Sequence, residues 1–129
     1  PLHLGSNGKA ILAFLPAKTR DELVAATGTI RCVDGRVIRK STLLADLATI
    51  RRRGYAISVQ ELVPDANSVS APVFDDSGQV VGCLGISGVV SRQSARDLSR
   101  FGTIVRDAAE RLSRDLGWGG TWQSMARSA

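Results

Sequence analysis

Residues 68–88 read SVSAPVFDDSGQVVGCLGISG, and this stretch predicts the β-hairpin that decides the fold. Two apolar runs flank residues 75–78 (DDSG). These residue types favour a turn, because Asp bonds nearby backbone and Gly tolerates positive φ. We expect a loop of four residues that pairs Phe74 with Gln79.

In this register the hairpin has one aliphatic face and one face of small residues, because strand side chains alternate between faces. A three-residue loop would bury serine hydroxyls among aliphatic side chains, at a cost of about 1–3 kcal/mol each if unpaired. We expect the aliphatic face to be core, whereas the small-residue face suits either a closely packed helix or the floor of a ligand cavity. The expected core face carries Val69, Ala71, Val73, Val80, Gly82, Leu84 and Ile86, and the small-residue face carries Ser68, Ser70, Pro72, Val81, Cys83, Gly85 and Ser87.

Length and composition indicate one globular domain. The chain has 129 residues, of which 43% are hydrophobic, enough for a core. No run approaches the ~18 apolar residues of a membrane span. The chain starts at Pro1 without a leader pattern, so we expect a fragment or processed piece with no signal peptide. Cys32 and Cys83 are isolated, which fits reduced thiols in a cytoplasmic protein.

The sequence does not favour an enzyme, a metal protein or a nucleic-acid reader. His3 is the only histidine, too few for a Ser-His-Asp triad or a metal site. The net charge of +5 is spread along the chain, and only residues 51–53 cluster. The GSNGKA stretch lacks the phosphate-loop pattern. Ser6 and Asn7 at a helix start could hold a carboxylate on free N–H groups, or could simply cap the helix. No cofactor is expected.

Helices are predicted where caps bracket apolar spacing. The first spans residues 6–15 and ends at Pro16. The second begins with a Thr19/Glu22 capping box and ends at Gly28. The third is capped by Ser41 or Thr42 and ends at Gly54, and the last runs from about Ser91 to Leu116 with a Ser94/Asp97 cap and a stripe of Leu98, Phe101, Val105, Ala108, Leu112 and Leu116.

The remaining segments complete an α+β prediction with an antiparallel sheet. Residues 55–62 alternate as a strand. Residues 30–38 (IRCVDGRVI) read as a hairpin around Asp34-Gly35 or, nearly as well, as a loop. We expect residues 1–117 to form the domain and residues 118–129 to be a frayed tail.

Three ordered blocks carry a family resemblance: PLHLGSNGKAILAFLP (residues 1–16), LADLATIRRRGYAISVQEL (44–62) and SAPVFDDSGQVVGCLGISGVVSR (70–92). Together they strongly resemble the C-terminal effector-binding domain of the IclR family of bacterial transcriptional regulators, over about residues 1–117. The resemblance implies a GAF-like fold, an antiparallel sheet flanked by helices with a small-molecule pocket on its concave face. It also implies that residues 29–41 form an extended loop.

The resemblance implies that two N-terminal parts of the family's proteins are missing from this sequence. The resemblance implies that the first helix and strands of the domain lie before Pro1, so the sheet lacks its N-terminal strands and exposes an edge. It also implies a homodimer or tetramer that contacts DNA only through an absent winged helix-turn-helix domain.

The resemblance places effector contacts at Ser6 and Asn7 and at sheet positions Ser58, Ser68, Gly85 and Ser87, to which the small-residue face adds Ser70 and Cys83. Members that bind 2-oxo acids tend to have Asp, Cys and Ser where this chain has Ser58, Ser68 and Gly85, and retain Ser at 87. The side chains lost at Gly85 and at the Asp position, Ser58, leave more room and imply a bulkier effector, such as an aromatic organic acid. The alternative is an oligomerisation module whose vestigial pocket is filled by side chains.

Overall fold

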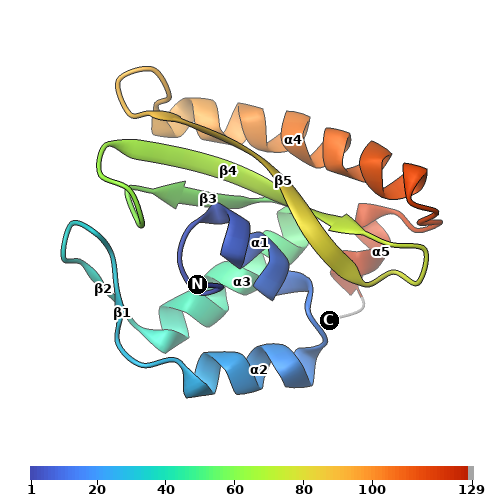
Figure 1. Ribbon diagram of the computed structural model, residues 1–129, viewed down its shortest axis with the longest axis horizontal. Coiled ribbons are helices and arrows are strands. Elements are labelled where there is room, and N and C mark those ends of the chain that lie inside the picture. Colours follow the sequence, from blue (N-terminus) through green and yellow to red (C-terminus); the bar gives the residue numbers. More distant parts are fainter. Residues whose placement is uncertain (128–129) are drawn as a thin grey trace.

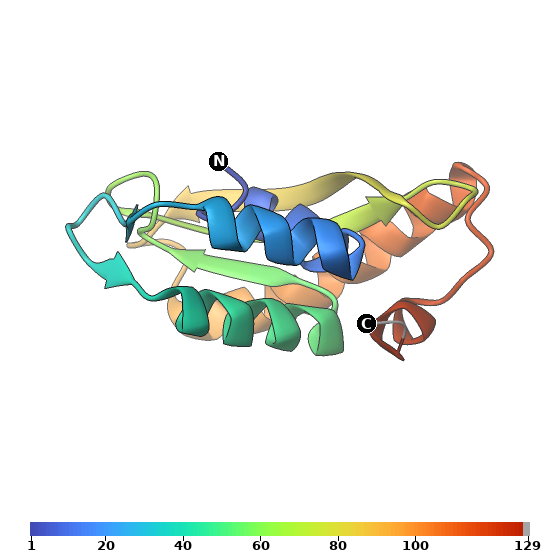
Figure 2. The ribbon, with the colours of Figure 1, turned by 90° about the horizontal axis from the view of Figure 1, so that it is seen from below.

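The domain is a three-stranded antiparallel sheet between helical layers (Figure 1). The computed structural model describes residues 1–127, and the strand order is β3 (Ala56–Val59), β4 (Ala66–Phe74) and β5 (Val80–Val89). Helix α4 (Ala95–Asp115) packs along one face of the sheet, and α1 (Ser6–Phe14) packs on the other. Figure 2 shows α3 (Lys40–Arg53) and α2 (Ala17–Ala26) beside α1. The predicted α+β class is confirmed.

The hairpin is present, but its register differs from the predicted one. Phe74 pairs with Val80, and after a bulge on β5 Val73 pairs with Gly82, so the loop has five residues instead of four. The Asp75 carboxylate accepts hydrogen bonds from the N–H groups of Ser77 and Gln79, which stabilises this longer turn. The predicted faces are retained from Gly82 onward, because the shift there is two residues and strands repeat every two.

The predicted core face is buried on β4 and partly exposed on β5. Val69, Ala71 and Val73 are buried against α4, whereas Leu84 and Ile86 are 37% and 41% exposed. Val80 moves to the opposite face with Phe74 and packs against the core beneath α1. Strand β5 is an edge of this sheet, so the expected exposed edge is found among the described residues.

The buried face of helix α4 differs from the predicted apolar stripe. Its capping box is confirmed, since the Ser94 Oγ accepts from the Asp97 N–H and the Asp97 carboxylate accepts from the Ser94 N–H. Gly102 lies against the Tyr55 ring, where a Cβ would come within 2.4 Å of it. The buried line is therefore Leu98, Gly102, Val105, Ala109 and Ser113, while Leu112 and Leu116 of the predicted stripe are exposed.

The other predicted caps are wrong. Helices α1, α2 and α3 have Gly5, Pro16 and Arg39 at their N-caps, and none of these makes a side-chain cap bond. The stops are better predicted, because α1 ends before Pro16 and α3 ends at Gly54 with a φ of +84°.

Residues 30–38 form a small hairpin, so the loop implied by the resemblance is wrong. Strands β1 (Ile30–Arg31) and β2 (Val37–Ile38) pair antiparallel. Gly35 has a φ of +90°, as the Asp34-Gly35 turn signal requires. The predicted strand over residues 55–62 is shorter than expected, because β3 ends where Gln60 takes a φ of +50°.

The segment after Gly117 is packed on the domain, which corrects the prediction of a frayed tail for its described part. Trp118 is 5% exposed and its ring centroid lies 4.8 Å from that of Phe74. Trp122 begins a short helix, α5 (Trp122–Arg127), and is also buried. Residues 128–129 of the predicted tail lie outside the described residues. Among the described residues, no helix is long and apolar enough to cross a membrane.

The buried Trp118 gives a test of the tail. Trp118→Ala should lower the free energy of unfolding by about 3–5 kcal/mol, because it removes a large ring from the core. Urea denaturation followed by far-UV circular dichroism measures this loss. The control Leu116→Ala, at a position 48% exposed, should change stability by less than ~0.5 kcal/mol. Equal stability of the two variants would mean that the tail does not pack.

Candidate functional site

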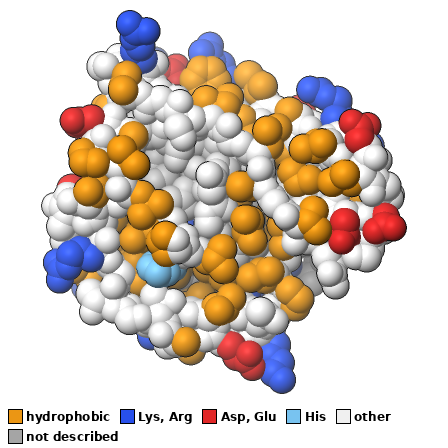
Figure 3. Space-filling model, in the orientation of Figure 1, with side chains coloured by type: hydrophobic (Ala, Val, Ile, Leu, Met, Phe, Trp, Pro, Cys, Tyr) orange, Lys and Arg blue, Asp and Glu red, His pale blue; other side chains and the backbone are white. Residues whose placement is uncertain are grey.

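A cavity of about 450 Å³ opens between the start of α1, the β3–β4 connection and residues of all three strands of the sheet. We call it the serine cavity. In Figure 3 the middle of this face is hollowed and mostly white, the colour of serine, asparagine, glycine and backbone atoms. The lining residues are Pro1, Leu4, Gly5, Ser6, Asn7, Gly8, Ser58, Leu62, Val63, Ala66, Ser68 and Ser87.

The floor of the serine cavity contains a row of serines across all three strands. Ser58 on β3 is the register partner of Ser68 on β4, and Ser68 is the partner of Ser87 on β5. Because directly opposed residues share a face, the three hydroxyls lie on the same side of the sheet. We call Ser58, Ser68 and Ser87 the serine row.

The start of α1 is fastened to this floor by side-chain hydrogen bonds. The Ser6 hydroxyl lies 2.7 Å from the Ser68 Oγ and 2.8 Å from the Ser70 Oγ. The Ser70 hydroxyl also donates to the Asn7 Oδ1. The prediction that Ser6 or Asn7 caps α1 is therefore wrong, because both side chains bond across to the sheet instead.

The small-residue face packs closely in one part and borders a cavity in the other. A Cβ on Gly85 would lie 2.3 Å from the Ser70 Oγ and 3.0 Å from the Asn7 Oδ1, so glycine is needed where α1 meets the sheet. One register step further along β5, Ser87 lines the cavity instead. The space left by Gly85 is thus taken by protein atoms.

The candidate residues accordingly fall into two groups. Ser6, Asn7, Ser58, Ser68 and Ser87 line the serine cavity. Ser70, Cys83 and Gly85 do not line it.

Two members of the second group are committed to other contacts. Ser70 is 1% exposed and fully engaged with Ser6 and Asn7. Cys83 pairs with Pro72 and packs toward the core, and burial raises the pKa of its thiol, which disfavours the reactive thiolate. Both cysteines are free thiols.

Sequence reasoning missed a buried ionic cluster that holds the cavity walls together. The Lys9 ammonium, 3% exposed as a residue, donates to the Asp46 carboxylate at 2.8 Å, the Glu61 carboxylate at 2.9 Å and the Ile57 carbonyl at 2.8 Å. The other Glu61 oxygen accepts from the Gly5 N–H at 2.8 Å. Glu61 thereby joins the β3–β4 connection to the loop before α1. No local sequence pattern marks this cluster, because the partners of Lys9 lie 37 to 52 residues away in the chain.

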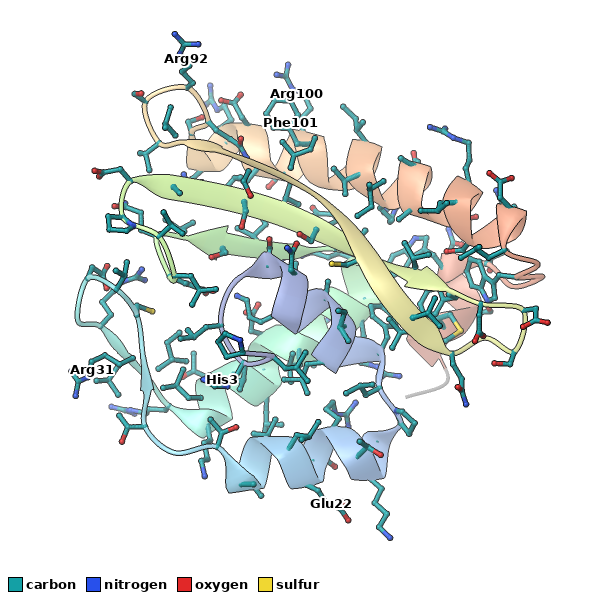
Figure 4. All side chains as sticks on the ribbon, viewed as in Figure 1. His3, Glu22, Arg31, Arg92, Arg100 and Phe101 are labelled. Carbon is teal, nitrogen blue, oxygen red and sulfur yellow. The ribbon has the colours of Figure 1, made fainter. Side chains whose placement is uncertain are left out.

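None of the described side chains that line the serine cavity is charged: the serines and Asn7 form its polar part, and Leu4, Leu62 and Val63 belong to its apolar part. The charged residues labelled in Figure 4, Glu22, Arg31, Arg92 and Arg100, lie at the periphery and point away from its centre. His3 borders a different, smaller cavity, and burial lowers the pKa of its imidazole. Within residues 1–127 there is no cluster of three potential His, Cys, Asp or Glu metal ligands. The donors available to a ligand are hydroxyls and the N–H groups of the first turn of α1.

Comparison with known proteins identifies close structural and sequence relatives. The family model described as "Bacterial transcriptional regulator IclR C-terminal" matches residues 1–114. The HTH-type transcriptional repressor AllR of Klebsiella pneumoniae is 34% identical over 117 residues, which cover 91% of this chain and 43% of AllR. The chain therefore spans less than half the length of the curated relatives it matches.

Solved structures agree with this match. The IclR protein of Thermotoga maritima superposes with a TM-score of 0.82 at 30% identity, covering 91% of this chain and 47% of that one. The inducer-binding domain of PobR from Acinetobacter, solved as a double mutant in complex with 3-hydroxybenzoic acid, has a TM-score of 0.73 at 22% identity, covering 88% and 65%. At that identity the PobR likeness shows the fold alone.

The contact at Gly85 can be tested directly. Gly85→Ala should lower the free energy of unfolding by about 1–3 kcal/mol, because the methyl group forces Ser70 and Asn7 apart. The matched control is Gly82→Ala on the same strand, where a Cβ meets nothing within 4 Å and stability should be unchanged or slightly raised. Chemical denaturation measures both. A Gly85→Ala variant as stable as the control would contradict this packing.

The ionic cluster predicts a non-additive pair of mutations. Lys9→Met should cost about 3–5 kcal/mol of unfolding free energy, because it leaves the buried Glu61 carboxylate without its cation. The double variant Lys9→Met/Glu61→Leu should recover part of that loss. Lys18→Met, at a side chain 89% exposed, is the control and should be nearly neutral. Strict additivity of the two changes would show that the pair does not interact.

Proposed function

The chain belongs to the C-terminal domain family of bacterial IclR transcriptional regulators, and on that premise we propose that its serine cavity binds a small organic acid. Proteins of this family are regulators, and the AllR relatives are named as repressors, so the domain is assigned to effector binding and not to catalysis. The observation that carries the proposal is the serine row, which opens onto a cavity of about 450 Å³.

The chemistry of the lining suits a carboxylate held without a cation. The N–H groups of the first turn of α1 form the positive end of the helix dipole, where an anion is stabilised. The hydroxyls of the serine row supply further donors. Lys9, a buried cation next to Gly8 in the chain, does not line the cavity, and its ammonium is already engaged by Asp46 and Glu61.

The walls of the cavity leave room for an apolar body on the acid. Leu4, Leu62 and Val63 line it together with the serines. Its volume lies within the ~300–1,000 Å³ range of small-molecule sites. The bulkier effector implied by Ser58 and Gly85 is supported at Ser58, which lines the cavity, whereas Gly85 contributes no space. An aromatic or similarly large organic acid fits this combination best.

The competing function is an oligomerisation module with a filled pocket. That function requires large side chains to occupy the space above the serine row. The described residues instead leave a cavity there, with Leu4, Leu62 and Val63 at its wall. The open cavity supports the sensor over the filled module.

Binding would act through the elements that border the cavity. A ligand contacts α1 through Ser6 and Asn7 and the β3–β4 connection through Leu62, so it would favour one relative position of these elements. In a homodimer or tetramer this would change how subunits pack, by a coupling of about 1–3 kcal/mol. DNA would be contacted by a winged helix-turn-helix domain outside these residues, in the cytoplasm.

The site is tested by filling the cavity. Calorimetric titration of the protein with benzoate, 3-hydroxybenzoate and pyruvate should identify a binding acid, with the aromatic acids preferred over pyruvate. Ser87→Trp should weaken the binding event at the serine cavity at least ~100-fold, because the indole occupies the cavity floor. Val81→Trp, on the same strand and 57% exposed, is the control and should bind like the unmodified protein.

Two outcomes would count against the proposal. If Ser87→Trp keeps every binding event of the unmodified protein at unchanged affinity, no acid binds at the serine cavity. If none of the acids binds while circular dichroism shows a folded protein, the oligomerisation module becomes the better function. Sedimentation with and without the bound acid then measures the coupling, which should shift the subunit dissociation constant ~5–150-fold.

A further inference from the structure

A second cavity lies at the end of α1 opposite the serine cavity. Its volume is about 300 Å³, and Arg51 from the last turn of α3 contributes to its lining. Figure 1 shows the end of α1, the start of β5 and α5 on one side of the molecule, where this cavity lies. We call it the arginine cavity. Its apolar lining includes Phe14, Leu15, Pro16, Val80 and Met125.

Arg51 is a buried cation without an anionic partner among the described residues. It is 8% exposed, and its Nη1 donates to the Ala13 carbonyl at 2.7 Å. Its Nε is buried and has no hydrogen-bond acceptor. Burial lowers the pKa of Arg51, and the like charge of the Arg20 guanidinium lowers it further. Buried charges are costly unless they are paired.

A purely structural role accounts for only part of this arrangement. Arg51 stabilises the end of α1 through the Ala13 carbonyl, and its Cζ lies 5.8 Å from the centroid of the Phe14 ring. These contacts use one of its N–H donors. The guanidinium fork matches a carboxylate in geometry, and the Ala13 carbonyl is its one hydrogen-bond acceptor among the described residues. The Nε is enclosed by protein atoms, so a carboxylate in the cavity would pair with the Nη end of the guanidinium.

We propose that the arginine cavity binds a small monocarboxylate with an apolar group. The carboxylate pairs with the Arg51 guanidinium, and the apolar group packs against Phe14, Leu15 and Val80. The apolar walls favour an organic acid over inorganic phosphate, because phosphate has no apolar group to pack against them. This site is separate from the serine cavity, which has no cationic side chain in its described lining.

The chain offers a specific reporter for this site. Met125 lines the arginine cavity and is the only methionine in the sequence, so a 13C-labelled methionine methyl group gives one assigned NMR signal. Titration with benzoate should shift this signal to saturation. Benzamide, which has nearly the same shape but no charge, should bind at least ~10-fold more weakly, because it lacks the charge-assisted bond.

Matched variants locate the binding. Ala17→Trp places a large ring at a position that lines the cavity and should abolish the benzoate shift. Ala26→Trp, also exposed on α2 but outside the cavity, should leave it unchanged. Ser87→Trp should also leave it unchanged, because that change fills the serine cavity. Arg51→Gln, where circular dichroism shows a folded protein, should reduce benzoate binding to the level of benzamide.

Each contrary result would overturn the proposal. No saturable shift with benzoate would mean that no acid binds. Equal binding of benzamide would show an apolar slot in which Arg51 plays no part, and equal binding of phosphate would show a general anion site. Loss of the shift in Ser87→Trp would show that the signal arises from the serine cavity through α1.

Discussion

The buried ammonium group of Lys9 is the constraint on which the site depends. A cation removed from water needs anionic partners, and Lys9 finds them on α3 (Asp46) and after β3 (Glu61). Satisfying this one charge fixes α1 against α3 and the sheet. It also draws Glu61 to the Gly5 N–H, which sets the loop that begins the serine cavity. The geometry of an uncharged site therefore rests on a charge buried beside it.

The small-residue face of the hairpin serves two purposes at adjacent positions. At Ser70 and Gly85 it allows α1 to approach the sheet closely, and the hydroxyls are used up in holding it there. Ser68 and Ser87 lie at the N-terminal limit of the helix and beyond it, so there the same kind of face borders open space. Where the end of a helix falls relative to the strand thus decides which serines can meet a ligand.

Helix α1 also connects two cavities of opposite character. At its N-terminus the donors are hydroxyls and the N–H groups of the first turn, which can hold an anion without a cationic side chain. At its C-terminus the helix presents carbonyl oxygens, which repel anions, and Arg51 bonds one of them while bordering the cavity. An acid at either end would meet a positive potential, supplied by the helix in one case and by a side chain in the other.

The sequence by itself determined the fold class, the hairpin, the stops of α1 and α3, and the two faces of β4, because these depend on alternation and on turn residues close in the chain. It also indicated the family and placed Ser58, Ser68 and Ser87 together. Only the tertiary structure decided that Trp118 is buried, that Ser70 occupies the space beside Gly85, and that Lys9 pairs with two carboxylates. The reason is distance along the chain: the partners of Lys9 lie 37 to 52 residues away, and no local pattern encodes which distant groups a buried charge will meet.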